Sequence, residues 1–251
     1  MNDITIKFLG HTTVLITTGG LKMIFDPNFA NKHFLLKRLD LPVIDSGELH
    51  QVNAIFISNA HHNRLHPKSF KYFKQTAQMI LPLGLGHHVN TFFHFRLSEL
   101  KAGAQTTIGD CRVTGVKSLH RAYRSNVFVQ KPALHYLLHL GDKTIFYCSD
   151  TSYDGSFFFD VGKDQKIDLA ILPVDHISPD LVAKKRFMNT RNALQAIQDM
   201  GAPKMIPYAF GAFNFASRKA DKIVAQLKKD AEQLNLLDRI HVLAPGEEMV
   251  L

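Results

Sequence analysis

The fold of this chain is decided by the stretch "AIFISNAHHNRLHPKSF", residues Ala54 to Phe70. The stretch begins with an apolar run that is typical of a buried strand, and Pro67 is a favoured first residue for a helix. Between these two elements lie three histidines, two asparagines and an arginine. Histidines gathered in one turn are typical of a metal-binding loop. The pattern therefore indicates either such a loop or one derived from it.

The composition describes a chain that can bury a large hydrophobic core. Of its 251 residues, 45% are hydrophobic, which is sufficient for an α/β domain of this length. No linker, low-complexity block or charge block interrupts the chain, so we expect a single domain over residues 1–251. The start lacks a leader-like pattern, and no apolar run approaches the roughly 20 residues that a membrane span needs. We expect a cytoplasmic protein without a membrane span.

Cysteine content and charge narrow the class of protein further. Cys111 and Cys148 lie in strand-like runs, are too few for a disulfide framework and lack CxxC spacing, so we expect buried thiols. The net charge of +8 would attract phosphates or other anions. Because the basic residues are spread from Lys7 to Arg239, we interpret the charge as a solvated basic surface.

Hydrophobic patterning predicts many short strands with helices between them. Helices are predicted from Pro67 through "KSFKYFKQ", over "NALQAIQDMG" with a glycine stop, and over "SRKADKIVAQLKKDAEQLNL" with a serine cap. The expected strands are Ile4–Leu9, Thr13–Thr17, Lys22–Phe25, Ala54–Ser58, Met79–Leu81, Gln105–Ile108, Arg112–Val116, Leu134–Leu140, Thr144–Cys148, Leu169–Pro173, Met205–Pro207 and Ile240–Leu243. This order of elements favours stacked sheets flanked by helices.

Two segments of the chain resemble each other. "TTGGLKMIFDP" and "LGDKTIFYCSDT" each contain a glycine turn, a lysine, an apolar strand and an aspartate near the end of the strand. These aspartates are Asp26 and Asp150. The repeat favours a pseudo-symmetric sandwich with a site between its halves.

Seven motifs distributed over nearly the whole chain resemble one family. They are "FLGHTTVLI", "IFDPNF", "SNAHHNRLHP", "VTGVKSLH", "FYCSDTSYDG", "LAILPV" and "MIPYAFGAF". Together they resemble the metallo-β-lactamase superfamily, and within it the branch of ascorbate-6-phosphate lactonases and phospholipase-D-type hydrolases of N-acylethanolamine phospholipids. The resemblance implies an α/β fold, a four-layer αββα sandwich with a metal site at the sheet edges.

The resemblance also implies which positions would surround the metals. In active relatives these positions carry histidines and aspartates, beginning with a His-x-His-x-Asp-His loop. Only His61, His120 and Asp150 keep such side chains. The matching positions in this chain are Asn59, His61, Asn63, Arg64, His120, Asp150 and Ala209.

The residue types at these positions limit the metal content. Arginine has no lone pair to donate and alanine offers none, so a second metal position built from residues 63, 64 and 209 is lost. Two histidines and a carboxylate can hold a single divalent ion. The resemblance implies a first position with His61, His120 and Asp150 as ligands and Asn59 as a weak fourth. We expect one zinc or other divalent ion there, with a metal-free cluster as the alternative.

The remaining polar residues are assigned supporting roles. Asp26 is expected to orient a histidine or to cap the loop, and Arg64 to replace part of a lost metal's charge by a bidentate contact with Asp150. His11 is interpreted as structural. Asn63, Ala209 and His87 are expected to line the pocket, and solvent-facing or locally bonded roles are expected for His62, His66 and His88.

Three functional hypotheses follow. In the first, the chain is at most a mononuclear hydrolase of an ester, lactone or phosphodiester, in which Asp150 and His120 act in catalysis and Arg64 steadies the developing oxyanion. In the second, it is a metal-free pseudoenzyme that binds a small anionic ligand or a protein partner. Nucleic-acid binding is ranked last, because the sequence lacks an RNA-recognition signature. Oligomerisation is left open.

Overall fold

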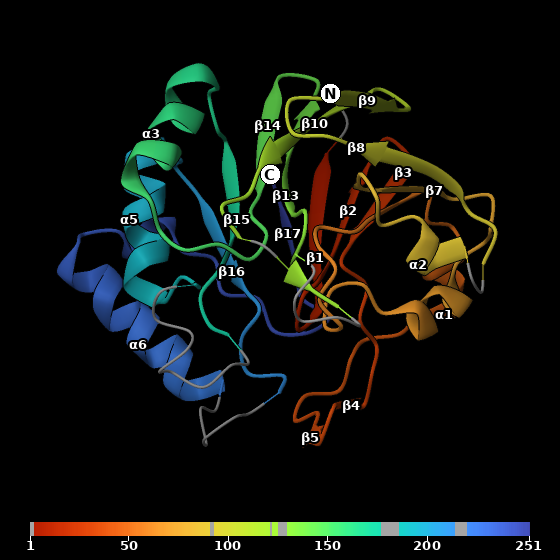
Figure 1. Cartoon of the computed structure of the whole chain (residues 1–251). Coiled ribbons are helices and arrows are strands. Elements are labelled where there is room, and N and C mark those ends of the chain that lie inside the picture. Colours follow the sequence, from red (N-terminus) through yellow and green to blue (C-terminus); the bar gives the residue numbers. More distant parts are fainter. Residues whose placement is uncertain (1–2, 91–92, 121, 125–129, 177–185, 214–219) are drawn as a thin grey trace.

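Four layers make up the computed structural model, which describes residues 3–251 except 91–92, 121, 125–129, 177–185 and 214–219. Two sheets face each other in the middle, and helices cover the outer face of each (Figure 1). The expected α/β fold with αββα layering is therefore confirmed. Among the residues that the structure describes, every helix falls short of the length and apolarity that a bilayer crossing requires.

The two central sheets contain seven and six strands. The first sheet has the spatial order β17 (Glu248–Val250), β1 (Ile4–Gly10), β2 (Thr13–Thr18), β3 (Leu21–Phe25), β6 (Ala54–Phe56), β7 (Gln78–Pro82) and β8 (Arg96–Leu100). The second has the order β16 (Met205–Tyr208), β15 (Leu169–Pro173), β14 (Lys143–Tyr147), β13 (Leu134–Leu140), β10 (Cys111–Lys117) and β9 (Gln105–Ile108).

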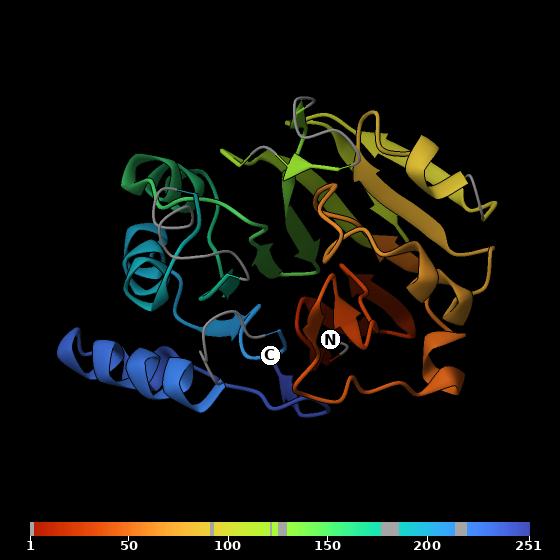
Figure 2. The ribbon, with the colours of Figure 1, turned by 60° about the horizontal axis from the view of Figure 1, so that its bottom comes forward.

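Helices of different length cover the two outer faces. The second sheet is covered by α3 (Gly155–Asp164), α5 (Thr190–Met200) and α6 (Ala220–Gln233), which stay on one side in both views (Figure 2). The first sheet is covered by shorter elements: α1 (Ser46–Leu49), α2 (His87–Asn90) and the 3-10 helix η1 (Pro67–Tyr72). The described residues also form the short 3-10 helix η2 (Leu237–Arg239) and two small strand pairs, β4 (Lys32–His33) with β5 (Leu36–Lys37) and β11 (Ala122–Tyr123) with β12 (Gln130–Lys131).

Three hydrophobic clusters hold these layers together. One lies between the sheets and joins side chains of β1, β2 and β3 to those of β10, β13 and β14, including Phe25, Tyr136 and Tyr147. The second lies between the second sheet and the long helices, and the third lies between the first sheet and the short ones. Each helical layer therefore buries its apolar side against a sheet, as amphipathic elements must.

The strand pairing of the two sheets is similar. In the first sheet, β1, β2 and β3 pair antiparallel, and β3, β6 and β7 continue as parallel neighbours. In the second, β10, β13 and β14 pair antiparallel, and β14, β15 and β16 continue in parallel. The two resembling sequence segments contain β3 and β14, so the expected pseudo-symmetry is present in the topology.

Several sequence-based assignments need correction. The predicted strand Ile240–Leu243 forms only an isolated bridge from Ile240 to Met205. The segment after Pro67 is a 3-10 helix, and the predicted cap Ser217 lies outside the described residues. Strands β8 and β17 and helices α1, α2 and α3 were not predicted. The glycine stop is confirmed, because Gly201 ends α5 in the left-handed conformation with φ of 65°. Both cysteines are buried and free, as predicted.

Candidate metal centre

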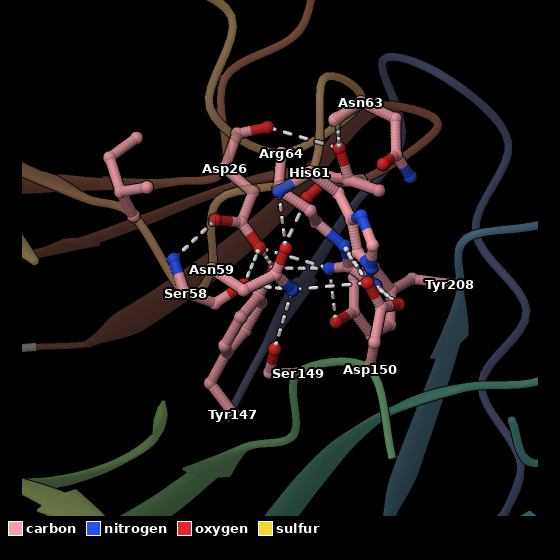
Figure 3. A network of polar contacts seen from close by, with 12 residues as sticks. Asp26, Ser58, Asn59, His61, Asn63, Arg64, Tyr147, Ser149, Asp150 and Tyr208 are labelled. Atoms are coloured by element: carbon pink, nitrogen blue, oxygen red, sulfur yellow. Dashed lines mark hydrogen bonds and ion pairs between the residues drawn. The ribbon is translucent and has the colours of Figure 1, made fainter. Parts of the chain in front are cut away.

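The loop that follows β6 carries most of the polar residues of the site. Ser58 and Asn59 are fully buried where the chain leaves the strand. The loop then turns tightly, because the backbone N–H groups of Arg64 and Leu65 both donate to the carbonyl of His61. This turn directs the His61 and Arg64 side chains toward Asp150, which lies at the edge of the second sheet (Figure 3).

His61, His120 and Asp150 form a compact cluster. The Nε2 atoms of the two histidines are 2.7 Å apart, and one donor atom from each of the three residues lies within 4.8 Å of the others. Ser118 links two members, because its hydroxyl donates to the Asp150 carbonyl at 2.9 Å and accepts from the His120 backbone N–H at 3.1 Å. The sequence analysis gave ligand roles to these three residues, and to Asn59 as a weak fourth ligand.

Burial keeps the two histidines neutral, and Arg64 keeps the aspartate charged. Burial lowers the pKa of His61 to about 4, against the opposite effect of Asp150. It also lowers the pKa of His120. For Asp150, burial opposes ionisation, but the Arg64 guanidinium and the two histidines outweigh it and hold the pKa of this carboxyl well below its usual range. Neutral imidazole and ionised carboxylate are the forms that bind metals.

Arg64 connects this cluster to the first sheet. Its guanidinium donates to Asp150 from Nη2 at 2.5 Å and from Nε at 3.3 Å, and to Asp26 from Nη1 at 2.9 Å. Nη1 also donates to the hydroxyls of Tyr208 and Tyr147. Burial alone would lower the pKa of Arg64, but Asp150 and the other partners raise it, so the guanidinium stays charged. The predicted bidentate contact is present.

The sequence led us to expect that Arg64 steadies a developing oxyanion, and the enclosure of its side chain argues against a direct contact with one. Its side chain has no exposed surface, and all three guanidinium nitrogens are engaged with protein partners. A group that is enclosed in this way cannot contact a substrate. These contacts favour a positioning role, in which Arg64 fixes the orientation and charge of Asp150.

Asp26 caps the start of the loop. Its carboxylate accepts the Ser58 backbone N–H at 2.7 Å and the Ser58 hydroxyl at 2.6 Å, and it also accepts from the Tyr147 hydroxyl at 2.9 Å. Burial raises the pKa of Asp26, and Arg64, Ser58 and Tyr147 offset part of this effect. Of the two expected roles, the contacts fit the cap: within the described residues the Asp26 carboxylate bonds to Ser58, Arg64 and Tyr147, and to no histidine.

Asn59 supports its neighbours through both ends of its amide. The amide nitrogen donates to the Asp150 carboxylate at 3.0 Å and to the Ser149 hydroxyl at 3.1 Å. The amide oxygen accepts the His61 backbone N–H at 2.9 Å. These contacts favour a role in orienting Asp150 and His61 over the expected role as a weak fourth ligand.

Other residues that were expected to line the pocket have partners outside the cluster. The Asn63 amide faces His11, with 3.4 Å between Nδ2 and Nε2. Ala209 is buried, and its backbone N–H donates to the His11 carbonyl. On α2, the rings of His87 and His88 are tilted by 43° to each other, with their centroids 3.8 Å apart. In the described part of the chain, the only group of three or more metal-ligand side chains is the one that contains His61.

His62 and His66 make local contacts. The His62 ring is exposed and lies 5.5 Å from the ring of Phe34. His66 Nδ1 is 2.8 Å from the Ser69 hydroxyl at the start of η1. Both histidines therefore have the local roles that were expected of them.

Sequence reasoning missed several residues that shape the site. Tyr147 and Tyr208 have the alternating strand pattern of core aromatics, and nothing in that pattern indicates that their hydroxyls meet Arg64. His135 is buried on β13, and its Nδ1 accepts the backbone N–H of Ser149 at 2.9 Å. A buried histidine inside an apolar strand is the one signal that could have identified His135.

The chain is similar in sequence and in fold to known metal-dependent hydrolases. The family model of the beta-lactamase superfamily domain matches residues 5–209. A metal-dependent hydrolase of Rubrobacter xylanophilus is 23% identical over 251 residues, covering 97% of this chain and 95% of that protein. An isothiocyanate hydrolase from Delia radicum gut bacteria superposes with a TM-score of 0.78 at 15% identity, covering 98% of both chains.

A further solved structure has the same fold. It is a metallo hydrolase from the archaeon Ignicoccus hospitalis, with a TM-score of 0.75 and 16% identity over 99% of this chain and 98% of that one. The family match covers more than half of the chain, and the topology and layering agree with it. The chain therefore belongs to the beta-lactamase superfamily and has the metallo-β-lactamase fold.

Proposed function

We propose that the protein is a hydrolase that uses one divalent metal ion, held by His61, His120 and Asp150, and acts on an ester, lactone or phosphodiester. The observation that carries this proposal is the convergence of three ligand-type donor atoms within 4.8 Å of one another. Membership of a family whose relatives include a metal-dependent hydrolase supports it. Zinc is the ion that we expect, because two imidazoles and a carboxylate form one of its usual ligand sets.

The residues fit a single ion after a small adjustment. Two nitrogens bound to tetrahedral zinc lie about 3.3 Å apart, since each bond is about 2.0–2.1 Å long. The histidine nitrogens are 2.7 Å apart, so the pair has to open by about 0.6 Å. His61 is half-buried and His120 is buried, and both lie in loops, where a movement of this size requires no change in the sheets.

The chain's own groups prepare this site for hydrolysis. Arg64 and Asn59 hold Asp150 in place, and the guanidinium keeps it ionised. Burial keeps His61 neutral. When bound, a divalent ion would act as a Lewis acid toward the carbonyl or phosphoryl oxygen of the substrate. Arg64 occupies the inner side of Asp150 with a fixed positive charge, which argues against a second ion there.

The contacts of the cluster also favour a second candidate, a metal-free protein that binds a small anionic ligand. The two histidines can hydrogen-bond to each other, and Asp150 has its charge balanced by Arg64. The cluster is therefore satisfied by protein partners alone. In this alternative the family fold is retained and the hydrolytic ion is lost.

Metal analysis distinguishes the two candidates. We expect close to one zinc ion per chain in protein purified without chelator and without a histidine tag, and none in the variant His61→Ala. The matched control is His62→Ala, because His62 is the neighbouring, exposed histidine. Close to two ions per chain would contradict the single site. No binding after dialysis against zinc would favour the metal-free candidate.

A further inference from the structure

The hairpin of β4 and β5 presents an apolar tip to solvent. Its strands pair Lys32 with Lys37 and His33 with Leu36, and Phe34 and Leu35 form the turn. Leu35 is 99% exposed and Phe34 is 74% exposed. Figure 1 shows the hairpin extending away from the sheets at the end of two long connections. The tip is therefore a convex protrusion with little of its own apolar surface buried.

Exposed apolar side chains are concentrated around this tip. The described part of the chain exposes ten large apolar side chains, and five of them lie between residues 34 and 44. Those five are Phe34, Leu35, Leu39, Leu41 and Ile44. Single exposed apolar residues need no explanation, whereas a concentration of them marks a surface that contacts another molecule or a membrane.

The turn itself does not require these side chains. Phe34 has a φ of 50°, in the left-handed region that two-residue hairpin turns favour for glycine or asparagine. A bulky aromatic residue is disfavoured there. The demands of the turn therefore do not explain the phenylalanine. Its ring meets those of His33 and His62 but stays largely exposed to solvent, which leaves most of its surface free for an external contact.

Positive charge accompanies the apolar tip. Lys32 and Lys37 are exposed and lie opposite each other at the base of the hairpin. Within the described residues, no ion pair involves either lysine, while the nearby Asp40 is paired with Arg38 at 2.8 Å. An apolar tip with two lysines behind it is complementary to a lipid bilayer, in which apolar acyl chains lie beneath anionic headgroups.

The spacing of these groups matches the depth of a lipid interface. Each strand residue advances by about 3.3 Å, so the lysines lie roughly 7 Å behind the tip. Interfacial elements bury their apolar side about 5–10 Å into the boundary between headgroups and acyl chains. With the tip at that depth, the two ammonium groups reach the level of the anionic headgroups.

The base of the hairpin is held on the body of the protein. The buried Arg38 donates from Nη1 to the Asn28 carbonyl at 2.8 Å, and its backbone N–H donates to the Asn31 carbonyl at 2.9 Å. The His33 ring packs 5.6 Å from that of Phe213. A hairpin that is already ordered loses less conformational entropy when it binds than a disordered segment would.

We propose that the β4–β5 hairpin docks this protein onto an anionic lipid bilayer surface, with Phe34 and Leu35 inserted and Lys32 and Lys37 at the headgroups. A second copy of the chain fits less well, because each copy carries a net charge of +8 and two pairs of lysines would approach each other. Because Phe34 touches His62 in the metal loop, docking places the loop beside the lipid surface.

Vesicle co-sedimentation of the full-length, untagged protein tests the proposal. We expect binding at low salt to vesicles of equimolar phosphatidylcholine and phosphatidylglycerol, and little binding to phosphatidylcholine alone. The double variant Phe34→Ser with Leu35→Ser should bind at least about tenfold more weakly, because two apolar side chains no longer leave water. Lys32→Gln with Lys37→Gln should weaken binding roughly tenfold and reduce its salt dependence.

The matched control is Phe159→Ser, which removes an exposed phenylalanine from α3 on another side of the molecule and should leave vesicle binding unchanged. Circular dichroism should show that all variants retain the fold, since each altered side chain is exposed. Absence of vesicle binding by the parent protein, or equal binding by the Phe34→Ser and Leu35→Ser double variant, would overturn the proposal. So would a dimer in sedimentation velocity that this double variant abolishes, because the occupant would then be a second copy.

Discussion

Strands β3 and β14 occupy corresponding places in the two sheets, and each is followed by an aspartate. The two aspartates have different surroundings. Asp26 follows β3 directly, whereas Asp150 lies three residues beyond the end of β14. Asp26 has no exposed side-chain surface, and its partners are Ser58, Tyr147 and Arg64. The Asp150 side chain is 8% exposed. The longer connection brings Asp150 to the edge of the sheet, beside the two histidines.

One cation serves both of these carboxylates. Arg64 donates to Asp26 with one nitrogen and to Asp150 with the other two. Pseudo-symmetry therefore supplies two buried carboxylates, and the position of each relative to the sheet edge decides what it does. The inner carboxylate caps a loop, and the outer one lies beside His61 (Figure 3).

The largest effect is expected from removing the shared cation. Arg64→Ala leaves two buried carboxylates without their charge partner, and breaking a buried ion pair in this way costs about 3–5 kcal/mol. The free energy of unfolding, measured by equilibrium urea denaturation, should fall by this amount. Arg64→Lys should cost less, because a lysine keeps the charge but lacks the planar fork that reaches both residues. A loss below about 1 kcal/mol for Arg64→Ala, typical of exposed pairs, would mean that the two halves are not joined through this side chain.

The sequence predicted this contact only in part. Bidentate pairing of Arg64 with Asp150 follows from the charge left by a missing metal, and the structure has it. Its second contact, with Asp26, depends on how closely the two sheets pack. No local pattern encodes that distance, and the same holds for the hydroxyls of Tyr147 and Tyr208.

Strands were predicted correctly where an apolar segment is hydrogen-bonded into a sheet. The prediction failed where an apolar segment only packs against other side chains. Ile240 and Val242 have the alternation of a strand, but they pack against the helical cluster of the second sheet. Conversely, β17 was missed because its three residues lie at a sheet edge and include the exposed Glu248. The fold was therefore predictable from the motifs and the buried strands, whereas the edge strands β8 and β17 of the first sheet were not.

An effect of intermediate size is expected when either aspartate is changed to asparagine, and zinc affinity should distinguish the two variants. Asp26→Asn and Asp150→Asn should each lower the free energy of unfolding by about 1.5–3 kcal/mol, because each removes hydrogen bonds to a charged group. Only Asp150→Asn should weaken zinc binding by about a hundredfold or more, since an amide oxygen is a poor substitute for a carboxylate ligand. Calorimetric titration of zinc into both variants measures this. An equal loss of zinc affinity in Asp26→Asn would refute the division into an inner and an outer carboxylate.

The smallest effect concerns two residues, one in each half, whose side chains accept a backbone N–H from the segment that follows β3 or β14. The hairpins end in the pairs Val14 with Phe25 and Tyr136 with Tyr147, so Thr13 and His135 occupy corresponding positions. The Thr13 hydroxyl accepts the Asn28 backbone N–H, and His135 Nδ1 accepts that of Ser149. Burial lowers the pKa of His135 to about 3, with a smaller opposite effect from Asp150. Of these two corresponding positions, only that of His135, in the half that contains Asp150, therefore carries a titratable side chain.

This difference predicts how stability depends on pH. Between pH 6.5 and about 3, the unfolded chain binds a proton at residue 135 that the folded protein excludes, so the contribution of His135 is complete above pH 6.5 and declines as the pH falls. From pH 7 to pH 6 this group alone should lower the free energy of unfolding by about 0.7 kcal/mol. In His135→Gln the amide oxygen can still accept the Ser149 N–H but does not titrate, so the loss between these two pH values should be smaller than in the parent by that amount. Identical losses in urea titrations of the two proteins would show that His135 titrates normally in the folded state, and that both halves support their turns without a proton-sensitive group.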